Sequence, residues 1–111
     1  MARAPLDLLQ GTLDVLILKT LSWGSTHGYG VSRAIRQRTD EVLAVEDAAL
    51  YQALHRLEKR GWVESEWGLS ENNRRAKFYR LTAEGRRHLR LEVTTWRQYA
   101  EAVFKVLEPA S

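Results

Sequence analysis

The chain contains no cysteine, and this absence excludes several classes of function. Without thiols there is no disulfide framework, no zinc–cysteine site, no iron–sulfur cluster and no thiol catalysis. A chain without cysteine also fits the reducing interior of a cell. Function must therefore rest on other side chains.

The sequence also lacks a long apolar run. Its longest apolar stretch covers residues 13–21 and is interrupted by Asp14 and Lys19. A membrane-spanning helix needs about 20 apolar residues, so this stretch is too short. The start of the chain, with Arg3 and Pro5, has neither the hydrophobic core nor the cleavage pattern of a signal peptide. A cytoplasmic location is therefore expected.

Catalytic and metal-binding patterns are missing as well. His27, His55 and His88 lie too far apart in the sequence for the short spacings of a metal site. Gly28 and Gly30 are not followed by the further glycine or the Gly-Lys-Ser/Thr of a phosphate-binding loop. Neither an enzyme activity nor a cofactor is expected.

The basic residues are concentrated in one segment. The whole chain of 111 residues has a net charge of only +3. Residues 74–90 hold seven basic residues and one acid, so this window is strongly positive and the remainder is slightly acidic. Such a window is typical of a surface that binds an anionic polymer, but from charge alone a solvated, salt-bridged surface is equally plausible.

Hydrophobic periodicity predicts a first helix over residues 12–22, with Thr12 as N-cap and Asp14 in the first turn. One apolar stripe of this helix contains Leu13, Leu16, Ile17 and Leu21. Val15 and Leu18 lie off that stripe, so the helix is apolar nearly all round. A helix of this kind is buried on two sides, and a second subunit is the expected cover for one of them.

A second helix is predicted over residues 28–38, a short extended segment over 42–45 and a third helix over 47–60. The third helix has Asp47 as its expected N-cap and Gly61 as its stop. Its core side carries Leu50, Leu54 and Leu57, and its opposite side carries Ala48, Gln52, His55 and Lys59, flanked by Tyr51 and Arg56.

Residues 62–67 and 76–81 alternate as strands do, and the polar segment between them predicts a β-hairpin. Trp62 and Trp67 are expected to pack in the core and on the wing. A last helix is predicted over residues 82–107, about 39 Å long, with Thr82 as N-cap. Its heptad seam consists of Leu89, Val93, Trp96, Ala100, Val103 and Leu107. Such a seam outruns a small core and is typical of dimerisation, with Leu13 and Leu16 assisting.

This order of elements predicts a mainly α winged helix-turn-helix with a small β-hairpin wing and a long C-terminal dimerisation helix. The expected DNA-binding region is 1–81 and the dimerisation helix is 82–111, within one compact domain. The third helix would enter the major groove, and the wing would contact the sugar-phosphate backbone. The candidate DNA contacts are Ala48, Tyr51, Gln52, His55, Arg56, Lys59, Arg74, Arg75 and Lys77.

Five segments in this order resemble the PadR family of bacterial transcriptional regulators in its short form. They are Leu9-Gln10-Gly11-Thr12-Leu13-Asp14, His27-Gly28-Tyr29-Gly30, the run from Leu50 to Glu58, Gly61-Trp62-Val63, and the run from Arg74 to Thr82. The resemblance implies a homodimer that binds pseudo-palindromic operator DNA and represses transcription. It also implies release from DNA when a small, often aromatic, effector binds.

The resemblance implies roles for single residues too. Tyr51 matches a tyrosine that contacts a DNA phosphate, and Trp96 resembles a tryptophan that stacks on flat ligands between subunits of multidrug-binding relatives. Filling the dimer core is the alternative role for Trp96. The family often has Ser or Thr where this chain has Ala49, and Pro where it has Gln52. The family pattern therefore does not supply the operator sequence.

One alternative function remains at this stage. A winged helix can also be a protein–protein interaction module that does not bind DNA. The basic window beside a polar third helix favours DNA, because a protein-binding wing would expose apolar groups there.

Overall fold

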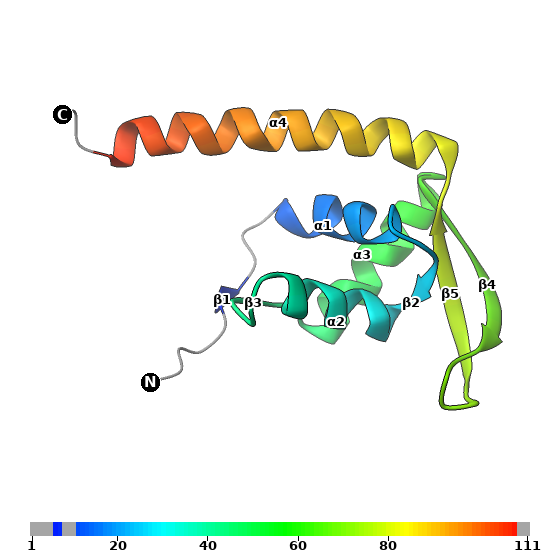
Figure 1. Cartoon of the computed structure of the whole chain (residues 1–111). Helices are drawn as coiled ribbons and strands as arrows, with labels where there is room; N and C mark the ends of the chain where they lie inside the picture. Colours follow the sequence, from blue (N-terminus) through cyan, green and yellow to red (C-terminus); the bar gives the residue numbers. More distant parts are fainter. Residues whose placement is uncertain (1–5, 8–10, 109–111) are drawn as a thin grey trace.

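The computed structural model describes residues 6–7 and 11–108. Within them the chain forms four helices, α1 (Thr12–Leu21), α2 (Gly28–Arg38), α3 (Asp47–Lys59) and α4 (Ala83–Leu107). A hairpin of β4 (Val63–Leu69) and β5 (Arg75–Leu81) connects α3 to α4. The predicted fold class, mainly helical with a small hairpin and a long last helix, is confirmed (Figure 1).

Two further strand pairs were not predicted. β1 (Leu6–Asp7) pairs in parallel with β3 (Leu43–Ala44), which lies inside the predicted extended segment. β2 (Thr26–His27) pairs antiparallel with β5, so the larger sheet has the order β2-β5-β4. Because β2 directly precedes α2, this pairing ties the start of α2 to the hairpin. The motif residues Leu9 and Gln10 lie outside the described residues.

Of the three predicted helix N-caps, one is confirmed and two are wrong. Thr82 is the N-cap of α4 as predicted, and its hydroxyl accepts a hydrogen bond from the Gly85 amide at 3.0 Å. The predictions for Thr12 and Asp47 are wrong, because both residues already belong to their helices. The residues before them, Gly11 and Glu46, take the cap position without a side-chain hydrogen bond. Asp47 instead places its negative charge in the first turn, where the helix dipole favours it.

Helix α1 is the centre of the core. It lies between α4 on one side and α2 on the other, and it also contacts α3 (Figure 1). Ile17 and Leu18 are fully buried, as are Leu50 and Leu54 of α3. The chain itself therefore covers Ile17 and Leu18. Leu13 and Leu16 of the same helix are only partly buried, and their contact with a second subunit stays a prediction.

The first half of α4 also belongs to this core. Leu89 is only 7% exposed and packs in the main hydrophobic cluster, so its prediction as a dimer contact is corrected. Val93, Leu13 and Leu16 pack against the same cluster and are partly buried. A heptad pattern reports that a helix face is apolar, but not whether its own chain covers that face. The second half of α4 extends past the start of α1 (Figure 1).

Close packing at the start of α4 generates a prediction about Gly85. A Cβ on Gly85 would lie 2.0 Å from the backbone carbonyl oxygen of Trp62, which cannot move independently of the chain. We expect Gly85→Ala to lower the free energy of unfolding by about 1–3 kcal/mol or more, although alanine is the better helix former. Urea unfolding at a fixed protein concentration measures it. Gln98→Ala, on an exposed part of the same helix, is the control, and equal stability of both variants would contradict the contact.

Candidate nucleic-acid interface

Helix α3 is oriented as its sequence pattern predicts. Leu50, Leu54 and Leu57 are buried against the core. The opposite side, with Ala48, Gln52, His55 and Lys59, is exposed. Tyr51, on the flank of that side, is 51% exposed. The core therefore determines which side chains of α3 a partner can reach.

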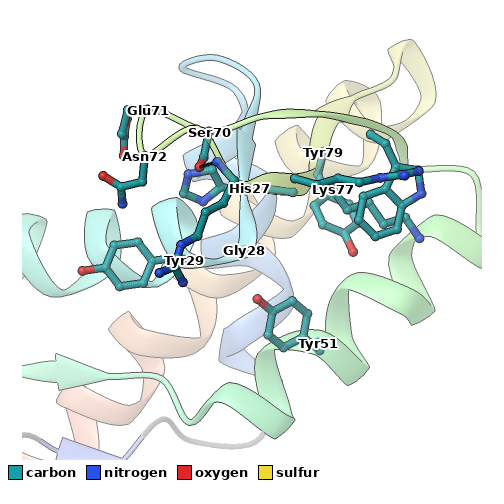
Figure 2. Close-up of a pocket in the computed structure, with 13 residues that line it drawn as sticks. His27, Gly28, Tyr29, Tyr51, Ser70, Glu71, Asn72, Lys77 and Tyr79 are labelled. Carbon is teal, nitrogen blue, oxygen red and sulfur yellow. Dashed lines mark hydrogen bonds between the residues drawn. The ribbon is translucent and has the colours of Figure 1, made fainter.

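A hollow of about 640 Å³ lies between the start of α2, helix α3 and the hairpin. Figure 2 shows its lining residues, with Tyr51 rising from α3 toward Gly28. Of the predicted DNA contacts, the hollow brings together Tyr51, Arg74, Arg75 and Lys77. Ala48, Gln52, His55, Arg56 and Lys59 are on α3 outside its lining.

The turn of the hairpin places the two arginines beside this hollow. The Ser70 amide donates to the Arg74 carbonyl at 2.8 Å, and the Asn73 amide donates to the Ser70 carbonyl at 2.9 Å. Asn73 has a φ of 57°, a left-handed conformation that asparagine tolerates better than most residues. The turn therefore directs the chain into β5 with Arg74 and Arg75 both exposed.

The start of α2 forms another wall of the hollow. His27 is the N-cap of α2, and its Nδ1 accepts a hydrogen bond from the Gly30 amide at 3.0 Å. Its ring also meets Phe78 edge to face, with 5.4 Å between the ring centroids. His27 is thus a capping residue that joins α2 to the sheet. The sequence pattern identified this turn but not the histidine cap.

Glu58 links the exposed helix to the wing. Its carboxylate accepts a hydrogen bond from the Ser65 hydroxyl at 2.5 Å and lies 3.4 Å from the Lys77 ammonium. The hydrogen bond from Ser65, aided by the charge of Lys77, holds the pKa of Glu58 below its ordinary value despite partial burial. Lys77 is therefore partly neutralised inside the protein. Its remaining charge for a phosphate is smaller than the sequence suggests.

Arg56 has an internal partner as well. Its guanidinium lies 2.5 Å from the Asp14 carboxylate, and that of Arg60 lies 3.9 Å from the same group. Asp14 is in the first turn of α1, so these pairs hold α3 against α1. Arg56 remains a predicted DNA contact, but binding DNA would have to compete with Asp14.

The two wing-side tryptophans have different environments. Trp62 packs as expected, with its ring stacked on His88 at a centroid distance of 4.0 Å. The packing prediction for Trp67 is wrong, because this side chain is 59% exposed and lines the hollow. The Arg75 guanidinium lies 4.9 Å from the Trp67 ring centroid, a cation–π contact.

The remaining candidate dimer residues lie on the second half of α4. Trp96 is 38% exposed and meets Tyr99 edge to face, with centroids 6.5 Å apart. Leu107 is exposed, whereas Ala100 and Val103 are half-buried. The heptad pattern missed Tyr99, Phe104 and Val106, which are exposed and broaden the apolar face. Their signal in the sequence is the rise in apolar residues toward the end of the helix.

Residues 6–7 and 11–108 contain no group of three or more His, Cys, Asp or Glu side chains that could hold a metal ion. Among the helices described for this chain, none is long and apolar enough to cross a membrane.

Comparisons with known proteins agree with this geometry. A sequence model of the transcriptional regulator PadR-like family matches residues 17–91. The chain is 30% identical over 102 residues to an uncharacterised protein of Lysinibacillus sphaericus, covering 92% of this chain and 94% of that one. It is similar to the structure of a transcriptional regulator from Clostridium thermocellum, with 34% identity, a TM-score of 0.78 and coverage of 86% and 90%. A PadR family regulator from Eggerthella lenta has 33% identity, a TM-score of 0.74 and coverage of 91% and 86%.

The contact between Glu58 and the wing predicts a pH-dependent contribution to stability. Glu58→Gln keeps an oxygen acceptor for Ser65 but removes the attraction to Lys77. We expect this variant to be about 0.5–1 kcal/mol less stable than wild type near neutral pH. Because folding lowers the pKa of Glu58, its contribution is present above the ordinary value of 4.5 and is lost as the pH falls below it.

Urea unfolding of both proteins across this pH range measures the difference. Glu66→Gln is the matched control, since Glu66 is an exposed acid of the same hairpin without an ion pair among the described residues. A stability difference that stays constant down to pH values well below 4.5 would contradict the assignment.

Proposed function

The chain belongs to the PadR-like family of transcriptional regulators, and we propose that it binds double-stranded operator DNA as a homodimer and represses transcription. Membership of this family makes the chain a transcriptional regulator and not an enzyme. We place its action in the cytoplasm, where bacterial operators lie. The winged helix-turn-helix of residues 1–81 would contact DNA, and residues 82–111 would join the two subunits.

One observation carries the DNA-binding proposal. Tyr51, on the flank of the exposed side of α3, and the basic wing lie around a single hollow, with Tyr51 on one wall and Arg74 and Arg75 on another. A helix that enters the major groove needs an exposed polar side, and the adjacent phosphates need cations. Gln52 and His55 would read base edges, because they lie on the exposed side of α3. Tyr51 and the wing would contact phosphates, which supply affinity without sequence information.

The proposed dimer interface is the second half of α4. Trp96, Tyr99, Phe104 and Leu107 are all exposed in the single chain although they are apolar or aromatic. A continuous exposed patch of this kind indicates a protein interface. Pairing of two α4 helices would bury it, and the two helices α3 of a symmetric dimer would then reach successive half-sites of an inverted repeat.

We further propose that a planar aromatic effector binds between the two copies of Trp96. A residue near a twofold axis meets its own copy, so two indoles form either a packed pair or a slot for a flat molecule. The exposure of Trp96 in the single chain is compatible with both arrangements. An effector could weaken DNA binding only to the extent that it prefers one dimer geometry over the other.

The alternative, a protein-binding wing, has one observation in its favour. Trp67 and Leu69 are exposed on the hairpin, so the wing does present apolar surface. The Arg75 guanidinium lies over the Trp67 ring, however, which keeps a positive charge at this surface. Binding to duplex DNA distinguishes the two functions.

Salt dependence tests the DNA-binding proposal. Arg74, Arg75 and Lys59 offer about three phosphate contacts per subunit and six per dimer, which gives a slope of log K against log salt near −5. We expect replacement of both Arg74 and Arg75 by alanine to flatten this slope by about 3–4. Fluorescence anisotropy with a labelled duplex of random sequence measures this slope. A second labelled duplex, with the sequence of the intergenic DNA beside the gene, tests for specific binding.

The matched control replaces Arg86 and Arg90 by alanine. It removes the same number of charges from α4, which lies on the far side of α1 from α2 (Figure 1). Equal effects of the two double variants would mean that general charge, and not the wing, determines binding. If the wild-type protein binds neither duplex, the result would favour the protein-binding alternative.

A charged substitution on the exposed apolar surface of α4 tests the dimer. Leu107→Glu changes a side chain that is 69% exposed in the single chain, so the fold of the subunit should persist. In the proposed dimer it would bury unpaired charges, and we expect dissociation at low micromolar concentration. Gln98→Glu adds the same charge to the opposite side of α4 and is expected to leave the mass unchanged. Sedimentation equilibrium measures the masses, and a dimeric Leu107→Glu protein would place the interface elsewhere.

Tryptophan fluorescence tests the effector site. We expect planar aromatic compounds to quench wild-type fluorescence saturably, and this quenching to be lost in Trp96→Leu. Trp23→Leu is the matched control, because Trp23 is also exposed but lies after α1, outside the α4 surface. Saturable quenching of unchanged affinity in Trp96→Leu would remove Trp96 from the effector site.

A further inference from the structure

Gly28, the first residue of α2, is buried beneath the side chain of Tyr51. A Cβ on Gly28 would lie 2.8 Å from Cε1 and 2.9 Å from the hydroxyl oxygen of Tyr51. Real Cβ atoms do not approach other atoms this closely, so a side chain at position 28 would overlap the Tyr51 ring where it now stands. The α2 helix and the α3 helix meet at this point of the hollow.

The backbone does not require glycine at this position. The glycines with a positive φ in the described chain are Gly11, Gly24 and Gly61, and Gly28 is not among them. A residue in a helical conformation normally gains stability when glycine is replaced by alanine. The cap of α2 does not require it either, because the bond runs from the Gly30 amide to the His27 ring. The Tyr51 ring is thus the structural feature that excludes a side chain.

The contact with Gly28 bears on the rotamer of the Tyr51 side chain. Its side chain is half-exposed, and a free tyrosine on a helix surface would sample several rotamers. Holding a side chain in its bound rotamer before binding avoids an entropy cost at the moment of binding. With the hydroxyl end of its ring against Gly28, Tyr51 lines the hollow between the start of α2, helix α3 and the hairpin.

We infer that Gly28 is a positioning residue for DNA binding: its missing side chain lets the Tyr51 ring settle on α2 with its hydroxyl directed at a DNA phosphate. The inference rests on the proposed function, since it assigns a role to the same surface. Gly28 itself makes no side-chain contact with the phosphate. It acts through Tyr51.

A double-mutant cycle tests this role. Affinity for a labelled duplex is measured at one salt concentration for wild type, Gly28→Ala, Tyr51→Ala and the double variant. We expect Gly28→Ala to weaken binding about a hundredfold, close to the effect of Tyr51→Ala, because one hydrogen bond to a charged group is lost in each of the two subunits. In the Tyr51→Ala background, Gly28→Ala should change affinity less than twofold.

Thermal unfolding separates positioning from a structural role. The Tyr51 ring is the end of a flexible side chain and can swing away, so Gly28→Ala should have a Tm equal to or above that of wild type. A lowered Tm that accounts for the loss of affinity would overturn the inference. So would wild-type affinity in Gly28→Ala, or an undiminished loss in the Tyr51→Ala background, which would mean that Gly28 acts through its own backbone.

Failure of the proposed function would look different. Wild-type protein would then bind duplex DNA weakly and without salt dependence, and all four proteins would behave alike. That result overturns the DNA-binding proposal together with this inference. Salt-dependent wild-type binding with an unaffected Gly28→Ala variant overturns the inference alone.

Discussion

The burial of one side of α3 under α1 is the constraint on which the rest of this surface depends. Leu50, Leu54 and Leu57 cannot leave the core without exposing apolar area and opening a cavity, at a cost of several kcal/mol for each. Their burial sets the rotation of α3 about its axis. Every residue proposed to meet DNA from this helix is placed by that rotation, although none of them contributes to the core.

Ion pairs then divide the basic residues into two groups. Asp14 holds Arg56, and Glu58 holds Lys77, so both cations help to join elements of the fold. Arg74 and Arg75 are instead exposed at the end of the hairpin. A net charge summed over the sequence cannot make this distinction. We therefore expect the proposed phosphate contacts to lie mainly at the tip of the wing, where the guanidinium groups are exposed.

Periodicity predicted the helices and the hairpin well because each has a repeating pattern several residues long. It missed β1 and β2, since a strand of two residues has no period and its pairing depends on residues far away in the chain. It could not find the pair of Asp14 with Arg56, which are 42 positions apart. Periodicity also does not show whether the chain itself covers an apolar residue. Leu89 is buried within the chain, whereas Trp67 is exposed.

The two halves of α4 connect the proposed dimer surface to the proposed DNA surface. Leu89 and Val93 anchor the first half on α1, and α1 in turn packs against α3. The second half, with Trp96 and Leu107, has its apolar side chains exposed. A change in how two second halves pack would rotate or shift each α4 as a rigid helix, and the close-packed core resists absorbing that movement. The movement would reach α3 through α1, so a ligand that favours one packing of the α4 pair can change the separation of the two DNA-reading helices without touching either of them.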